Sequence, residues 1–200
     1  MYEYQARISR VIDGDTVEVR ISGHRWITQV ELIGIDAPER ANHTETGQEP
    51  WGARAQQYLA LQIAQRQVKI EFDPARPAES KVLWGYLWME DRLMNAEMLA
   101  QGLALAKPDN DGLLYADRLE AAQALAKNSQ RGVWDSSNPL TVLPWEFVAE
   151  KTSEKEEQEQ KEEALEITQW QVGCAVGNRK TKKFHMPGGM YYESAKTSKH

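Results

Sequence analysis

The sequence contains only one cysteine, Cys174, in 200 residues, and it lacks any long apolar run. A single cysteine excludes a disulfide bond within the chain, and a membrane-spanning helix needs about 20 mostly apolar residues. No secretory signal is visible, because MYEYQARISRVIDGDT enters strand-like sequence at once. We therefore expect no membrane segment. The sequence leaves the localisation unknown: we expect export if a leader has been removed, and a cytoplasmic protein otherwise.

An excess of positive charge is also missing from most of the chain. The net charge is −6, and residues 1–149 hold 15 Lys and Arg against 21 Asp and Glu. Proteins that bind nucleic acid by neutralising its phosphates are usually basic. If this part of the chain acts on phosphates, we expect it to need a cation.

The pattern of apolar residues predicts strands first and helices later. Short, partly alternating, β-branched segments indicate strands, and apolar residues at helical spacing indicate helices. A run of strands followed by helices favours a small closed barrel over alternating parallel units. The fold class is therefore mainly β with α, that is, α+β. The expected strands are residues 2–12, 15–22, 26–35, 67–73 and 82–89, and the expected helices are 47–65, 95–106 and 113–132.

The composition changes along the chain and predicts three parts. Residues 1–136 are expected to form the barrel domain. Residues 137–169 are expected to be a linker with an acidic spacer, helical or disordered, because positions 150–166 hold eight Glu and three Lys. Residues 170–200 are expected to be a small basic C-terminal segment. Its candidate nucleic-acid contacts are Arg179, Lys180, Lys182 and Lys183.

Two acidic turns stand at the ends of predicted strands. Asp13 and Asp15 flank Gly14, and Asp36 and Glu39 flank an Ala-Pro pair. Each turn alone is typical of an ordinary chain reversal. Together they supply the carboxylate oxygens that calcium binds with flexible geometry. The sequence therefore predicts a site for one divalent ion.

These motifs resemble the staphylococcal nuclease-like, or thermonuclease, family. The matching stretches, which cover residues 6 to 134 in order, are VIDGDTVEV, ELIGIDAPE, GARAQQYL, VKIEFD, GYLW with LMNAEMLAQGLA, and YADRLEAAQALAKNSQRGVW. The resemblance implies an OB-type five-stranded barrel with three helices and a small C-terminal appendage. It also implies Ca²⁺-dependent hydrolysis of DNA or RNA, for which we expect a monomer that prefers single strands.

The resemblance assigns roles to individual residues. Asp15 and Asp36 match the calcium-binding carboxylates, and the backbone carbonyl of Ala37 matches another oxygen ligand. Glu39 matches the glutamate that positions or deprotonates the attacking water. The residues matching the neighbours that shape the metal turn are Asp13 and Thr16.

The chain departs from the family at two positions where the resemblance implies arginine. These positions hold Glu31 and Val82. Arginine grips a phosphate with a bidentate fork and stabilises charge on its equatorial oxygens. The arginines near enough in sequence to compensate are Arg7, Arg10, Arg20, Arg25 and Arg40, of which Arg40, next to Glu39, is the first to test.

Two interpretations of Glu31 stay open. In one, Glu31 turns outward or becomes an additional ligand of the cation, and the protein is a nuclease with weak or altered catalysis. In the other, hydrolysis has been lost. The barrel then survives as a catalytically inactive module that binds nucleic acid or a protein.

Overall fold

The computed structural model describes residues 2–42, 46–75, 82–170, 176–178 and 183–185. The chain divides into two compact units, Met1–Phe147 and Val148–His200, and each is described by itself. In this described part of the chain, no helix combines the length and the apolar character needed to cross a membrane.

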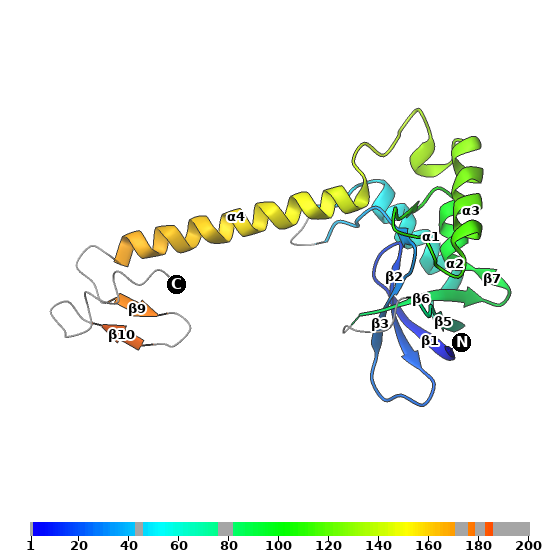
Figure 1. The fold of residues 1–200 in the computed structure, drawn as a ribbon, viewed down its shortest axis with the longest axis horizontal. Coiled ribbons are helices and arrows are strands. Elements are labelled where there is room, and N and C mark those ends of the chain that lie inside the picture. Colours follow the sequence, from blue (N-terminus) through cyan, green and yellow to red (C-terminus); the bar gives the residue numbers. More distant parts are fainter. Residues whose placement is uncertain (1, 43–45, 76–81, 171–175, 179–182, 186–200) are drawn as a thin grey trace. The chain divides into compact units, whose positions relative to one another are not determined.

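The first unit is built on a closed barrel of five strands (Figure 1). Neighbouring strands pair antiparallel in the order β3-β2-β1-β5-β6, and a parallel pairing of β3 with β6 closes the ring. Closure leaves no unpaired sheet edge among these strands. The α+β barrel expected from the sequence is therefore confirmed. The strands are β1 (Tyr2–Val11), β2 (Thr16–Ile21), β3 (Thr28–Leu32), β5 (Gln67–Phe72) and β6 (Val82–Met89).

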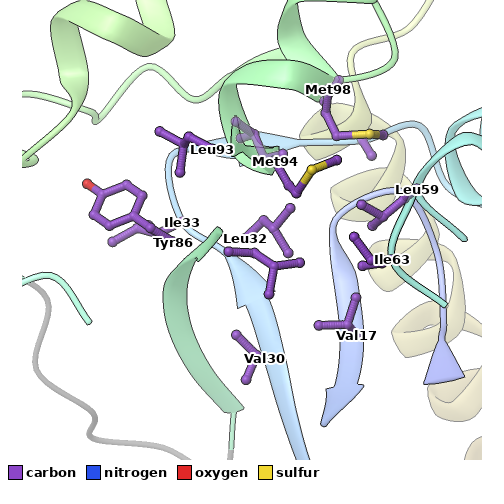
Figure 2. Close-up of a cluster of buried hydrophobic side chains, with 14 of the residues drawn as sticks. Val17, Val30, Leu32, Ile33, Leu59, Ile63, Tyr86, Leu93, Met94 and Met98 are labelled. Carbon is purple, nitrogen blue, oxygen red and sulfur yellow. The ribbon is translucent and has the colours of Figure 1, made fainter. Parts of the chain in front are cut away.

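Alternation along each strand places every second side chain in the barrel core, since strand side chains point to opposite faces in turn. In β2, Val17, Val19 and Ile21 are buried, whereas Arg20 is exposed. Figure 2 shows this core between the strands and the helices. The labelled side chains that meet there include Val17, Val30, Leu32, Leu59, Ile63, Leu93, Met94 and Met98.

Three helices pack against the barrel, at the end away from the tip of the β2–β3 hairpin (Figure 1). They are α1 (Trp51–Ile63), α2 (Met94–Ala100) and α3 (Ala116–Asn128), and the 3-10 helix η1 (Gly132–Trp134) follows them. Three two-residue strands complete the unit. β4 (Ile35–Asp36) pairs with β8 (Leu105–Ala106), and β7 (Arg92–Leu93) extends the hairpin of β6.

The helix predicted over residues 95–106 is wrong at its C-terminal end. α2 ends at Ala100, and Gly102 adopts a φ of +65°, a left-handed conformation that glycine enters without steric cost. A Cβ at this position would collide with the carbonyl of Arg131. The chain therefore leaves the helix early, and Leu105–Ala106 forms β8 instead.

Residues after η1 stay in contact with the barrel unit. The indole nitrogen of Trp51 donates to the carbonyl of Asn138 at 3.2 Å, and Leu140 and Trp145 pack against the core. The helix α4 (Pro144–Trp170) includes the acidic segment, whose side chains are largely exposed up to Glu162. Beyond it, β9 (Val176–Asn178) pairs with β10 (Lys183–His185).

Candidate metal centre

The first acidic turn is held by its own aspartate. Asp13 Oδ1 accepts hydrogen bonds from the backbone N–H groups of Asp15, at 3.0 Å, and Thr16, at 2.7 Å. Gly14 lies so close to the helix α1 that an added Cβ would stand 2.6 Å from the side chains of Ala37 and Ala55. The Asp-Gly-Asp sequence therefore makes a rigid turn that fits only without a side chain at its centre.

Asp15 links this turn to the second acidic segment. Its Oδ2 accepts a hydrogen bond from the backbone N–H of Ala37 at 2.7 Å, and its Oδ1 accepts one from the Thr16 hydroxyl at 3.1 Å. The backbone carbonyl of Asp15 also accepts from Leu32 N at 2.7 Å. Two segments that are separate in sequence are thereby fixed against each other.

Asp36 is positioned by a turn that two buried asparagines hold. Gly34 has a φ of +81°, and its carbonyl accepts from Asn110 Nδ2 at 2.7 Å. Asn95, which is fully buried, donates to the Ile33 carbonyl at 2.9 Å and accepts from Leu87 N at 3.0 Å. These bonds satisfy backbone groups that would otherwise be buried without partners. They fix the start of β4 and hence the position of Asp36.

The two aspartates lie in one electrostatic environment. Burial, followed by the charge of Asp13 and a hydrogen bond with it, raises the pKa of Asp15 well above its ordinary value, and Asp36 adds to this effect. Burial also raises the pKa of Asp36 to about 6, although Lys107 opposes the change and Glu31 and Asp13 assist it. The region therefore holds more negative charge than its own cations compensate.

This donor set fits a hard divalent cation. Two rigidly placed carboxylates next to a backbone carbonyl, that of Ala37, are oxygen ligands of the kind that calcium binds, and water molecules complete such a shell. Lys107 forms an ion pair with Asp36: its Nζ lies 3.9 Å from Asp36 Oδ1, and its side chain is 39% exposed. No group of three or more His, Cys, Asp or Glu side chains in the described residues is gathered as a metal-ligand cluster. The site thus offers two carboxylates rather than a complete protein cage.

Glu39 is held through its backbone. Its N–H donates to Gln48 Oε1 at 3.2 Å, and its carbonyl accepts from Gln48 N at 2.8 Å. Gly52 allows the start of α1 to approach closely, because a Cβ there would collide with the Glu39 carbonyl. The part of the Glu39 side chain in the site stays a prediction.

Glu31 faces a tryptophan of the neighbouring strand. The parallel register of β3 and β6 pairs Glu31 with Trp84 and Gln29 with Val82. The indole Nε1 of Trp84 donates to Glu31 Oε2 at 2.8 Å, and the tryptophan is 37% exposed. The charge of Glu31 also contributes to raising the pKa of Asp36, so Glu31 acts electrostatically on the candidate metal centre.

The structure describes the basic residues predicted to contact phosphates to different extents. Arg40 is exposed, and it is not among the charges acting on Asp15 or Asp36. Arg179, Lys180 and Lys182 lie outside the described residues, and Lys183 is described only as part of the backbone of β10. The predicted contacts of all four basic tail residues with nucleic acid stay predictions.

Several residues that shape the centre were missed by the sequence analysis. Lys107 approaches Asp36 through the β4–β8 pairing, and Asn95 and Asn110 hold the preceding turn. Gln48 ties Glu39 to the Val142 carbonyl, which its side chain reaches at 2.7 Å. Each of the four makes at least one contact with a segment 62 or more residues away in the sequence. No local pattern could have indicated these contacts.

The fold and this site define a small closed α+β barrel in which Asp15, just before the second strand, is hydrogen-bonded to the segment that carries Asp36. A family profile described as "Staphylococcal nuclease homologue" matches residues 29–136, more than half of the chain. The protein belongs to the staphylococcal nuclease family, which confirms the resemblance seen in the sequence.

Individual relatives support the same assignment. The chain is 32% identical to the thermonuclease of Staphylococcus intermedius over 130 residues, or 64% of this chain and 74% of that protein. It is 29% identical to protein ParB of Escherichia coli over 78% of this chain and 85% of that protein. It is 28% identical to endonuclease YhcR of Bacillus subtilis over 74% of this chain, but it spans only 13% of that much longer protein.

Proposed function

We propose that this protein is a Ca²⁺-dependent nuclease that hydrolyses phosphodiester bonds of DNA or RNA. The observation that carries the proposal is the pairing of Asp15 with the Asp36–Ala37 segment, in a member of a family whose relatives include a thermonuclease and an endonuclease. Both aspartates have raised pKa values because they are buried beside other acids. A bound divalent cation would relieve this unfavourable concentration of negative charge.

The residues of the centre have distinct roles in this proposal. Asp15, Asp36 and the Ala37 carbonyl hold the ion, which when bound polarises a phosphoryl oxygen and orients a water molecule. Glu39 accepts the proton that this water loses as its oxygen forms the new bond to phosphorus. The phosphorus–oxygen ester bond on the opposite side breaks, and the leaving oxygen takes a proton from solvent. Asp13 and Thr16 keep Asp15 in place.

Catalysis is expected to be slower than in a site with arginine at positions 31 and 82. Removing one preorganised donor to the developing charge costs about 100- to 1000-fold in rate. At position 31 the replacement is acidic, so it repels the phosphate that an arginine would attract. Glu31 therefore favours cation binding and disfavours substrate binding.

A second candidate function is a catalytically inactive barrel that binds nucleic acid. The hydrogen bond between Trp84 and Glu31 favours it, because it holds an acidic side chain at a position where phosphate binding calls for a cation. The two candidates differ in one observable, namely cleavage that depends on calcium and on Glu39.

The test is a titration of the purified full chain with Ca²⁺, and in parallel with Mg²⁺, using single-stranded DNA and RNA substrates. Cleavage and the thermal unfolding midpoint are followed together. The proposal predicts Ca²⁺-dependent cleavage that a chelator abolishes and that Glu39→Gln removes while the Ca²⁺-induced rise in midpoint persists. A rise in midpoint without cleavage in the wild type would favour the inactive barrel. No change in either measurement would refute the metal centre.

A further inference from the structure

The outer face of β1 and β2 carries two arginines directly opposite each other. Arg7 of β1 and Arg20 of β2 are register partners, and both are exposed. Their strand neighbours Ala6, Ile8 and Val19 are buried, so the arginines point away from the core. Like charges at opposite positions of an antiparallel pair destabilise it. Fold stability therefore gives no reason for this pairing.

The acids near these arginines do not neutralise them, because those acids already form ion pairs with other cations. Glu18 receives Arg10 at 2.8 Å, and Glu3 receives Lys69 at 2.9 Å. Within the residues that the structure describes, Arg7, Arg20 and Arg25 form no ion pair. This is a local excess of positive charge in a unit whose composition is acidic.

The adjoining tip of the β2–β3 hairpin exposes a large aromatic ring. Trp26 is 66% exposed, and the ring of His24 packs edge-on against it at a centroid distance of 6.1 Å. Arg20 Nη1 donates to the Arg25 carbonyl at 3.0 Å and so ties the strand to the tip. Cations that meet phosphates, together with an aromatic ring on which bases stack, are the two components of surfaces that bind single-stranded nucleic acid.

The position of these residues suits a nucleic-acid strand that also reaches the candidate metal centre. β2 begins at Thr16, directly after Asp15, and Arg20 lies four residues further along, about 13 Å away at strand spacing. Thr16, Glu18 and Arg20 alternate with buried residues and share one face. OB-type barrels bind oligonucleotides across strands 2 and 3, with about 4–16 nucleotides per barrel.

We propose that Arg7, Arg20, Arg25 and Trp26, here called the hairpin patch, form a second contact site for single-stranded nucleic acid. The inference deepens the proposed function, on which it rests, by adding a site that holds the strand away from the scissile bond. The phosphates lie against the arginines, and a base stacks on Trp26. The patch contributes binding energy that the centre lacks because Glu31 and Val82 stand in place of cations.

The test measures binding of the full chain to a fluorescent oligo(dT) of about 20 nucleotides in a chelator, so that hydrolysis plays no part. Each lost phosphate contact flattens the slope of log K against log salt by about 0.7 for single strands. Arg7→Gln with Arg20→Gln should therefore flatten it by about 1.4, and Trp26→Ala should weaken binding about tenfold with little change in slope. The matched control, Arg92→Gln with Arg131→Gln, changes net charge equally at two exposed arginines of other segments.

The control variant and the thermal unfolding midpoint separate a specific loss of nucleic-acid binding from an effect of net charge or of unfolding. We expect the control pair to bind like the wild type. Arg7→Gln with Arg20→Gln should keep an unfolding midpoint close to that of the wild type, because relief of the repulsion between two facing charges offsets loss of the hydrogen bond from Arg20 to the Arg25 carbonyl. Equal binding by patch variant and wild type would overturn the proposal. An equal loss in patch and control variants would also overturn it, since net charge alone would then explain the effect.

Failure of the hairpin patch and failure of the nuclease proposal have different signatures. If both hold, the patch variants raise KM for the long oligonucleotide but not for a dinucleotide, which cannot span both sites. If the protein does not cleave at all, the binding measurement in chelator still tests the patch. Cleavage with unchanged KM for both substrates in the patch variants would refute the patch and leave the nuclease proposal standing.

Discussion

Asp36→Asn should stabilise the cation-free protein while destroying its cation site. Burial raises the pKa of Asp36 to about 6, from an ordinary value of 3.8, with Lys107 opposing and Glu31 and Asp13 adding to the effect. Because the pKa is higher in the folded state, ionisation of Asp36 works against folding. The protonated form of Asp36 therefore favours folding. This contribution to the free energy of unfolding is fully present below about pH 4 and is lost as the pH rises through about 6.

The size of the effect follows from the same values. A tenfold change in proton affinity corresponds to about 1.4 kcal/mol, so full ionisation of Asp36 costs at most about 3 kcal/mol. An asparagine resembles the protonated acid in shape and charge, and it should recover most of this amount at neutral pH. For a chain of this size, about 3 kcal/mol raises Tm by about 6–12 °C.

Urea unfolding in a chelator, repeated from pH 4 to pH 8, measures the effect. The advantage of Asp36→Asn over the wild type should be small at pH 4 and should open between about pH 4 and pH 6. Saturating Ca²⁺ should reduce the difference in stability between Asp36→Asn and the wild type, because only the wild type binds the ion. A ligand at 100 times its Kd stabilises the folded state by about 2.7 kcal/mol. An advantage that is absent at pH 7, or that is just as large at pH 4, would refute the electrostatic reasoning.

A matched aspartate with the opposite environment provides the control. Hydrogen bonds from the backbone and hydroxyl of Ser137 lower the pKa of Asp135, which is only partly exposed. Its ionised form therefore favours folding above its unfolded pKa, and this contribution is lost as the pH falls. Asp135→Asn should lower stability at neutral pH, and the deficit should disappear on acidification. The two variants should differ in sign.

Three further predictions concern the same region. Glu39→Gln should lower cleavage about 100-fold or more without loss of Ca²⁺-induced stabilisation, and equal cleavage by variant and wild type would exclude Glu39 as the base. Glu31→Arg should raise the cleavage rate by up to about 100-fold and weaken Ca²⁺ binding, whereas Glu31→Gln should weaken Ca²⁺ binding with a smaller gain in cleavage rate. Kinetics at several Ca²⁺ concentrations measure the cleavage rate and the Ca²⁺ affinity together. If neither variant changes either quantity, the role given to the Glu31 charge is contradicted. Asn95→Ala should cost about 3 kcal/mol in urea unfolding, because it leaves the buried Leu87 N–H and the Ile33 carbonyl without the partner that Asn95 provides. A cost below about 1 kcal/mol would contradict this.

The strands and the carboxylates were predictable because their signals are local. Alternation in TVEVRI sets which side chains of β2 face the core, and the Asp-Gly-Asp turn carries its own hydrogen bonds. The end of α2 was not predictable in the same way. It depends on the approach of the Arg131 backbone to Gly102, a contact between distant segments. Local helix propensity extended the prediction too far.

The surroundings of Asp36 and Glu31 depend on how the barrel closes. Trp84 meets Glu31 only because β3 pairs in parallel with β6 in one register, and Lys107 reaches Asp36 only through β4 and β8. A shift of one residue would turn every side chain to the other face. The sequence could name the acids, but the partners that set their pKa values depend on tertiary pairing.

Nucleic acid should enter the cleavage site only after the cation. Asp13 and Glu31 place negative charge near Asp36, and Lys107 partly opposes it. A phosphate approaching the cation-free centre is therefore repelled, whereas a bound divalent ion reverses the local sign. In Glu39→Gln, which should bind without cleaving, a dinucleotide should bind at least about tenfold more tightly with saturating Ca²⁺ than in chelator. A long oligonucleotide should show a smaller dependence, since the hairpin patch binds it without the ion. Equal dinucleotide affinity in both conditions would mean that the acidic centre does not control access of the phosphate.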